Sequence, residues 1–229
     1  VDPLVGRVVA AVATDQDVSH MVDVAPDGTR AWVASIGSGT VSAIDLDGDQ
    51  MTLRGTVPTG KGTEAIAVRP DARAVWAAAR AEGAVVTLDA AGVEVGDRWE
   101  VTGVPIRLAF APDGSRAYVT RAGAGDVVAM DAATGTIVAQ QRIDVPLAPD
   151  AARRPFAGLA PGSPLPVGLL VAPDGRSLYV AATMADRVVQ LDARNLAVLR
   201  SIEVGGEPDG LAVTPVMPQK PCHACVQQE

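Results

Sequence analysis

Four polar side chains with the capacity for chemistry recur at matching places in the sequence. His20, Glu64 and Arg107 each stand near the start of a short apolar run, and Asp209 begins another. A histidine beside a carboxylate can hold or transfer a proton, and an arginine can bind an anionic group. We expect these four residues to form one ligand-binding site. The alternative is that they hydrate one surface or pair with each other.

A proline-rich segment, residues 144–166, carries a second group of candidate binding residues. It holds six of the 17 prolines, together with Arg153, Arg154 and Phe156. Proline makes the segment stiff and non-helical, so ordering it costs less entropy than ordering a glycine-rich loop. Adjacent arginines beside an aromatic ring can grip a carboxylate or phosphate of a partner. The alternative is a solvated loop whose arginines offset nearby aspartates.

Near the end of the sequence, residues 222–225 form the motif Cys-His-Ala-Cys, in which Cys222, His223 and Cys225 could bind a metal or haem. Covalent haem attachment needs a histidine directly after the second cysteine, where Val226 stands. A metal site would need ligands from another chain or from residues outside this sequence, because there is no second cysteine pair. We therefore expect free thiols or a disulfide in a frayed tail, and we predict no bound metal and no cofactor.

Motifs for catalysis are scarce. The only histidines are His20 and His223, and no serine lies in the glycine pattern of a nucleophile elbow. Residues 45–49 resemble the start of a calcium loop but lack its later glutamate. Four aspartates recur with the repeat described below and are typical of strand-end turns: Asp45, Asp89, Asp131 and Asp192. These residues predict no particular reaction.

The composition limits the classes of protein that fit. The 229 residues carry a net charge of −8, which argues against a nucleic-acid partner because phosphate binding needs clustered lysine and arginine. The charge-free apolar runs are too short to span a membrane. With 48% hydrophobic residues the chain has ample material for a core, and that core must form by packing because the body of the chain lacks cysteine.

A repeat of about 42 residues organises the chain. Prolines at positions 26, 70, 112 and 173 each follow an apolar run, so that their spacings are 44, 42 and 61 residues. Each proline precedes an aspartate, and in three units a glycine follows. Pro-Asp-Gly between apolar runs is a hairpin turn, because glycine accepts a positive φ. Ala72 replaces that glycine in the second unit, and we expect strain there.

Each turn is followed by three further apolar segments in the same order. The first is centred on an aromatic residue, the second ends at an aspartate, and the third completes the unit. The aromatic positions are Trp32, Trp76, Tyr118 and Tyr179. The segments are short, rich in valine and alanine, and lack the 3.6-residue spacing of helices, which predicts an all-β chain with four strands per unit packed on both faces.

The repeat unit resembles the YVTN repeat of bacterial and archaeal β-propellers, which include surface-layer and lactonase-like members. Its motifs follow in the order strand, Pro-Asp-Gly, Trp/Tyr-Val-Ala/Thr, Gly-Thr-Val, Ile/Leu-Asp. The resemblance covers residues 19–216. It implies four-stranded antiparallel blades, a ring of about seven blades, and export from the cytoplasm. The asparagine that ends the family motif is replaced here by Ser35, Ala78, Arg121 and Ala182.

On this reading residues 1–216 form an arc of a larger ring, followed by a tail at 217–229. Four complete blades are expected at 19–60, 61–103, 104–166 and 167–208. Residues 1–18 would supply the outer strand of a preceding blade, within 6–13, and residues 209–216 the inner strand of a following blade. An open arc exposes sheet edges, so we expect a fragment of a longer protein, self-association, or completion of the ring by another chain.

Blade topology brings the candidate residues to one face. The start of each innermost strand lies near the central channel, on the face that also carries the 144–166 insertion. We therefore predict a scaffold that binds a small ligand or a partner protein through this face. The alternative is an enzyme, either a lactonase-like hydrolase or a subunit of an oxidoreductase whose cofactor lies on a partner chain or in a missing segment.

Overall fold

The computed structural model describes residues 1–2 and 4–214, and within them the chain is almost entirely β-structure. Sixteen strands form four separate sheets of four strands each. Blade 1 contains β1 (Ser19–Val24), β2 (Arg30–Ser35), β3 (Thr40–Asp47) and β4 (Gln50–Pro58). Blade 2 contains β5 (Thr63–Val68), β6 (Ala74–Ala79), β7 (Ala84–Asp89) and β8 (Val95–Glu100). Blade 3 contains β9 (Pro105–Phe110), β10 (Arg116–Arg121), β11 (Asp126–Asp131) and β12 (Ile137–Arg142). Blade 4 contains β13 (Pro166–Val171), β14 (Ser177–Ala182), β15 (Arg187–Asp192) and β16 (Val198–Glu203).

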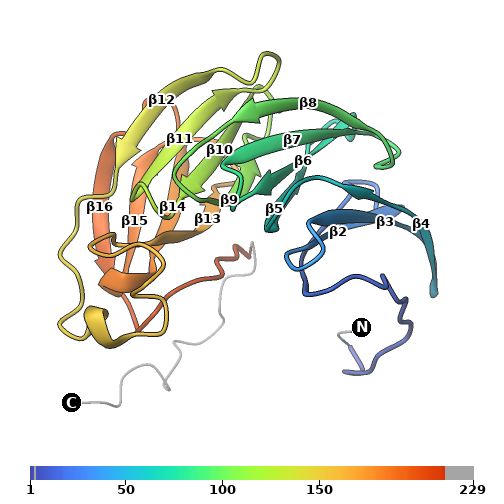
Figure 1. The fold of residues 1–229 in the computed structure, drawn as a ribbon, viewed down its shortest axis with the longest axis horizontal. Helices are drawn as coiled ribbons and strands as arrows, with labels where there is room; N and C mark the ends of the chain where they lie inside the picture. Colours follow the sequence, from blue (N-terminus) through green and yellow to red (C-terminus); the bar gives the residue numbers. More distant parts are fainter. Residues whose placement is uncertain (3, 215–229) are drawn as a thin grey trace.

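Each sheet is an antiparallel meander in which consecutive strands are neighbours. The sheets stand side by side around an open arc, with β1, β5, β9 and β13 innermost (Figure 1). This is a partial β-propeller, as the repeat predicts. Two short 3-10 turns are the only helical elements among the described residues, η1 (Ala151–Arg153) and η2 (Thr183–Ala185), and no described helix is long and apolar enough to cross a membrane.

The repeated turns form as the sequence predicts. Gly28, Gly114 and Gly175 all have positive φ, between +68° and +72°. Ala72 keeps the same left-handed conformation, with φ at +56°, so its Cβ is placed where L-residues are disfavoured. In every unit the turn aspartate accepts a hydrogen bond from the backbone N–H two residues later.

The core lies between the blades rather than within a single sheet. Blades 1 and 2 enclose one cluster of buried side chains around Trp32 and Leu88, and blades 3 and 4 enclose another around Tyr118 and Leu191. Between blades 2 and 3, the ring of Trp76 lies 5.1 Å from that of Phe110. Each such buried aromatic contributes roughly 1.5–3 kcal/mol relative to an exposed one, so the blades stabilise each other.

The two ends of the described chain differ from the expectation. Residues 6–13, predicted as an outer strand, form only one isolated bridge, between Asp2 and Arg7. Residues 209–214 form no strand either. A strand needs a neighbouring strand to accept and donate its hydrogen bonds, and the neighbours that these segments would pair with are not among the described residues. Their assignment to adjoining blades stays a prediction.

Candidate functional site

The starts of the innermost strands converge on Glu64. Its carboxylate is buried, with 6% of the side chain exposed, and accepts a hydrogen bond at Oε1 from Arg107 Nη1 at 3.0 Å. Arg80 Nη1 lies 3.0 Å from Oε2, and His20 Nε2 lies 3.6 Å from Oε1. Arg107 Nη2 also reaches Asp209 Oδ1, at 3.3 Å. The structure therefore brings His20, Glu64, Arg107 and Asp209 together, and it adds Arg80.

A β-bulge near the start of each innermost strand positions His20 and Glu64. The pairing of β1 with β2 omits His20, and the pairing of β5 with β6 omits Glu64. In blade 3 the omitted residue is Ile106, and in blade 4 the register jumps from Pro166 to Leu169. A bulge inserts one unpaired residue and turns its side chain out of the regular alternation. The bulged residues His20, Glu64 and Ile106 all line one cavity, whereas Arg107 is the paired residue that follows the bulge of blade 3.

These side chains line a cavity of about 470 Å³, here called the mouth cavity. One part of its wall is charged and the other is apolar, the latter including Phe156 and Leu159 of the insertion. The lining residues are His20, Ile36, Glu64, Arg80, Ile106, Arg107, Phe156, Leu159, Leu165, Val167, Thr183, Glu207 and Asp209. Its size and its mixture of apolar and converging polar groups are those of small-molecule sites.

The three candidate residues of the insertion do not act as one group. Phe156 is 54% exposed and lines the mouth cavity, which places the insertion beside the channel residues. Arg153 is exposed at the end of η1. The Arg154 side chain is only 9% exposed, because it pairs with Asp150 and Asp186. The expected arginine pair is thus split, and Arg154 is engaged within the protein.

Asp186 joins three segments of this region. Its two carboxylate oxygens accept hydrogen bonds from Arg154. These bonds, with the Glu207 backbone N–H and the Arg154 charge, lower the pKa of Asp186 to about 2. The backbone N–H of Glu207 donates to Oδ1 at 2.9 Å, and that of Val204 donates to the Asp186 carbonyl at 3.0 Å. Asp186 itself has φ at +54°, directly after η2. One residue thus fixes the insertion and the segment after β16 to the hairpin of blade 4.

Residues 204–210 return from β16 toward the innermost strands (Figure 1). The Thr183 hydroxyl donates to the Pro208 carbonyl at 2.8 Å. A Cβ added to Gly168 would lie 1.8 Å from the Asp209 carbonyl oxygen, so only glycine allows this segment to pass so close to β13. The close passage brings Glu207 and Asp209 to the mouth cavity.

Sequence reasoning did not single out Arg80 and Glu207 as site residues. Arg80 follows β6, in a loop of the face that carries the channel residues, and that position is a signal that could have found it. Glu207 reaches the cavity only because Asp186 and Gly168 determine the path of residues 204–210. No sequence pattern marks that contact.

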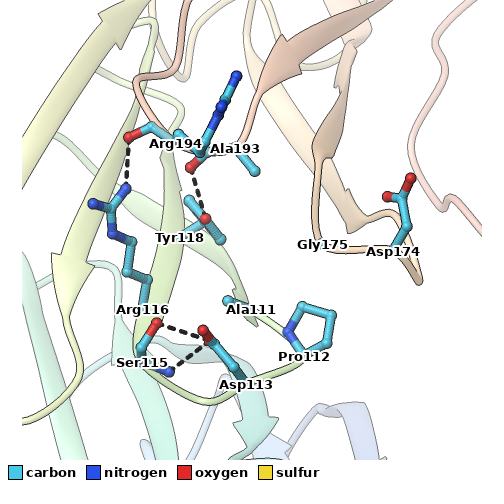
Figure 2. Close-up of a pocket in the computed structure, with 10 residues that line it drawn as sticks. All are labelled: Ala111, Pro112, Asp113, Ser115, Arg116, Tyr118, Asp174, Gly175, Ala193 and Arg194. Atoms are coloured by element: carbon cyan, nitrogen blue, oxygen red, sulfur yellow. Dashed lines mark hydrogen bonds between the residues drawn. The ribbon is translucent and has the colours of Figure 1, made fainter.

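A second cavity, of about 370 Å³, lies between blades 3 and 4 at the opposite ends of the strands (Figure 2). Its main polar groups are satisfied within the protein. Tyr118 Oη donates to the Ala193 carbonyl at 2.8 Å, and Arg116 Nη1 donates to the Arg194 carbonyl at 2.6 Å. In blade 1, Arg30 makes a similar contact with a carbonyl of the next blade, that of Ala90. This recurrence indicates a junction between blades rather than a ligand site.

Comparisons with known proteins identify the fold. No family model matches the chain, and no curated protein does. Among solved structures, a functionally unknown protein of Desulfotomaculum acetoxidans matches with a TM-score of 0.71 and 13% identity, over 89% of this chain and 61% of that one. The chain is a partial β-propeller.

Two further structures share this fold. The hydrazine synthase of Kuenenia stuttgartiensis matches with a TM-score of 0.68 and 19% identity, over 83% of this chain and 50% of that one. The periplasmic gluconolactonase of Pseudomonas aeruginosa matches with a TM-score of 0.62 and 20% identity, over 83% and 55%. The chain thus spans less than two thirds of each, and the likeness extends to the fold alone.

Cys222, His223 and Cys225 lie outside the described residues.

Proposed function

We propose that this propeller is a ligand-binding scaffold whose recognition site is the mouth cavity. The observation that carries the proposal is convergence: bulged residues of blades 1 and 2, the insertion and the segment after β16 all line one cavity of about 470 Å³. Its rigid blades hold the charged groups, and loops supply the apolar wall. Binding sites commonly consist of such loops on a stable framework.

The ligand that fits this cavity is a small organic molecule with an apolar part and a polar edge. Phe156 and Leu159 offer exposed apolar surface, while His20 and Asp209 offer polar atoms at the rim. Glu64, Arg80 and Arg107 hold one another through ion pairs, so the charged wall is ordered before a ligand arrives. Such preorganisation lowers the entropy cost of binding.

The test is a thermal-shift screen of small aromatic and aliphatic molecules of each charge type. A ligand at about ten times its Kd adds about 1.4 kcal/mol of stability, which raises the Tm of a protein of this size by about 3–6 °C. Leu159→Trp fills the mouth cavity and should abolish the shift. Leu199→Trp on β16, an exposed leucine that does not line the mouth cavity, is the matched control and should retain it. Shifts that survive Leu159→Trp would place binding elsewhere.

A second candidate function is lactone hydrolysis. What favours it is the His20–Glu64 contact of 3.6 Å at the mouth of a fold shared with a gluconolactonase. His20 would take a proton from water as the water attacks the lactone carbonyl, and Glu64 would stabilise the resulting imidazolium. The imidazolium would then return this proton to the ring oxygen as the bond between that oxygen and the carbonyl carbon breaks. Acid release from δ-gluconolactone tests this candidate. A wild-type rate equal to spontaneous hydrolysis, or one unchanged in His20→Ala, excludes it.

Membership of the YVTN-repeat family and export from the cytoplasm are part of the proposal. They rest on the repeat motifs and support a role in the periplasm or at the cell surface. The ring of about seven blades, the partner that would complete it and the role of an oxidoreductase subunit stay predictions. The mass and oligomeric state of the native protein would test the first two together.

A further inference from the structure

The two guanidinium groups of the mouth cavity are already paired with carboxylates. Arg107 donates to Glu64, to the Ile106 carbonyl at 2.9 Å and to Asp209. Arg80 lies against Glu64 Oε2. An anionic ligand would have to compete with these internal carboxylates for each arginine. The cavity therefore offers little to an anion, although two arginines line it.

Acidic groups are in surplus. Within the described part of the chain, the Glu207 side chain makes no ion pair and no hydrogen bond, and only its backbone N–H is bonded, to Asp186. Asp209 contacts only one nitrogen of the Arg107 guanidinium, Nη2, and its side chain is mostly exposed. Glu64 is different, because both of its carboxylate oxygens already face an arginine at 3.0 Å. The cavity thus has one unpaired carboxylate among its described lining residues, that of Glu207.

The apolar wall suits the same kind of ligand. Phe156 exposes half of its surface and lines the cavity together with Glu207. The face of an aromatic ring attracts an ammonium group, and the attraction grows when the ammonium is partly desolvated. Leu159 and Ile36 supply further apolar contact for the body of the ligand. The net charge of −8 also favours the approach of a cation over that of an anion.

We propose that the mouth cavity binds a small organic cation, a primary or quaternary amine that carries an apolar group. The ammonium lies between the Glu207 carboxylate and the Phe156 ring, and the apolar group lies against Leu159 and Ile36. This inference rests on the proposed function, because it names the ligand class of the same cavity. It assigns Glu207 the role of selecting charge and Phe156 the role of holding the cation.

The experiment uses three probes of one shape and different charge: phenethylamine, phenethyl alcohol and phenylacetate. Calorimetric titration of the full chain should show that the amine binds about tenfold more tightly than the alcohol, and that phenylacetate binds most weakly. Glu207→Gln should weaken the amine about three- to tenfold and leave the alcohol unchanged. Glu203→Gln, a carboxylate on β16 that is 81% exposed and does not line the cavity, is the matched control and should change neither.

Each other outcome has a defined meaning. If the amine and the alcohol bind with equal affinity, and Leu159→Trp abolishes the binding of both, the mouth cavity is still the binding site but the preference for a cation is overturned. Tighter binding of phenylacetate, or an amine affinity unchanged by Glu207→Gln, also overturns the inference. If the amine does not bind at all the inference fails, whereas the proposed function is decided separately by the wider screen with Leu159→Trp.

Discussion

The guanidinium of Arg154 donates to both carboxylate oxygens of Asp186, at 2.6 and 2.7 Å. The two residues are 32 positions apart, one in the insertion and one in the β14–β15 connection of blade 4. Arg154 also donates to the Thr183 carbonyl at 3.0 Å. Because Asp186 in turn binds the backbone of Glu207, this single pair fixes both loops that complete the mouth cavity.

Replacing Arg154 with alanine should loosen the insertion without unfolding the blades. Loss of charge-assisted hydrogen bonds costs about 1.5–3 kcal/mol each in favourable cases, and here the loss falls on one loop. Trypsin cleavage after Arg153 reports the loosening, because Pro155 protects the bond after Arg154 in the wild type. We expect faster cleavage at Arg153 and an unchanged pattern elsewhere.

The control for that variant is Arg187→Ala. Arg187 also pairs with an acid near this region, but its partner Glu203 is largely exposed and lies 3.6 Å away. Such exposed pairs contribute about 0–1 kcal/mol. Equal cleavage rates at Arg153 in both variants would show that the Arg154–Asp186 pair does not hold the insertion.

Acid should weaken the protein through Asp186. Hydrogen bonds from Arg154 lower the pKa of Asp186 to about 2, below its ordinary value, so the folded state favours the ionised form. The resulting stability is present above about pH 4 and is lost as the pH falls toward 2. Urea unfolding should show a gap between wild type and Asp186→Asn that is constant near neutral pH and shrinks below about pH 4. A gap that widens with acid would contradict this assignment.

Gly168→Ala should displace residues 204–210. The new Cβ would overlap the Asp209 carbonyl, so either the segment or β13 must move. Such overpacking costs roughly 1–3 kcal/mol, and each kcal/mol lowers the Tm by about 2–4 °C at this size. Gly210→Ala adds the same methyl group to the same segment with nothing within 4 Å, and it should leave the Tm unchanged. A Gly168→Ala protein as stable as Gly210→Ala would mean that the segment does not pass there.

Ala72→Gly should stabilise the protein. Ala72 has φ at +56°, where an L-residue is strained by about 1–2 kcal/mol, and glycine removes that strain at a smaller cost in unfolded-state entropy. We expect a gain of about 0.5–1 kcal/mol in chemical denaturation. The reverse change at the equivalent turn, Gly28→Ala, should cause a loss because Gly28 has φ at +72°. The added Cβ would meet nothing within 4 Å, so this loss would report backbone strain and no steric clash. Two changes of the same sign would rule out this account of the turns.

The blades were predictable because their determinants are local and repeated. Proline and aspartate fix each hairpin turn, and the apolar runs on either side define β1 to β16 closely. The meeting of His20 and Glu64 was predictable for the same reason, since both stand six residues before the turn proline of their unit. Arg107 stands one residue later in its unit, and Ile106 holds the equivalent position. Even the strained turn at Ala72 followed from one missing glycine.

The rest of the candidate site depends on contacts between loops, which no local pattern encodes. The pairing of Arg154 with Asp186 joins two loops of different sequence character, and the repeat does not align them. The sequence favoured Arg154 as a binding residue, because adjacent arginines beside an aromatic ring can grip a carboxylate or phosphate. Glu207 enters the cavity only through a backbone hydrogen bond to Asp186 and a glycine in another strand.

The most direct test of the binding cavity is a crystallographic fragment screen of the full chain. We expect fragments to collect in the mouth cavity against Phe156 and Glu207, with amine fragments the most frequent among them. It also predicts few fragments in the cavity beside Tyr118, where the main polar groups are already paired. Fragments that collect beside Tyr118 and leave the mouth cavity empty would contradict the assignment of the mouth cavity as the binding site.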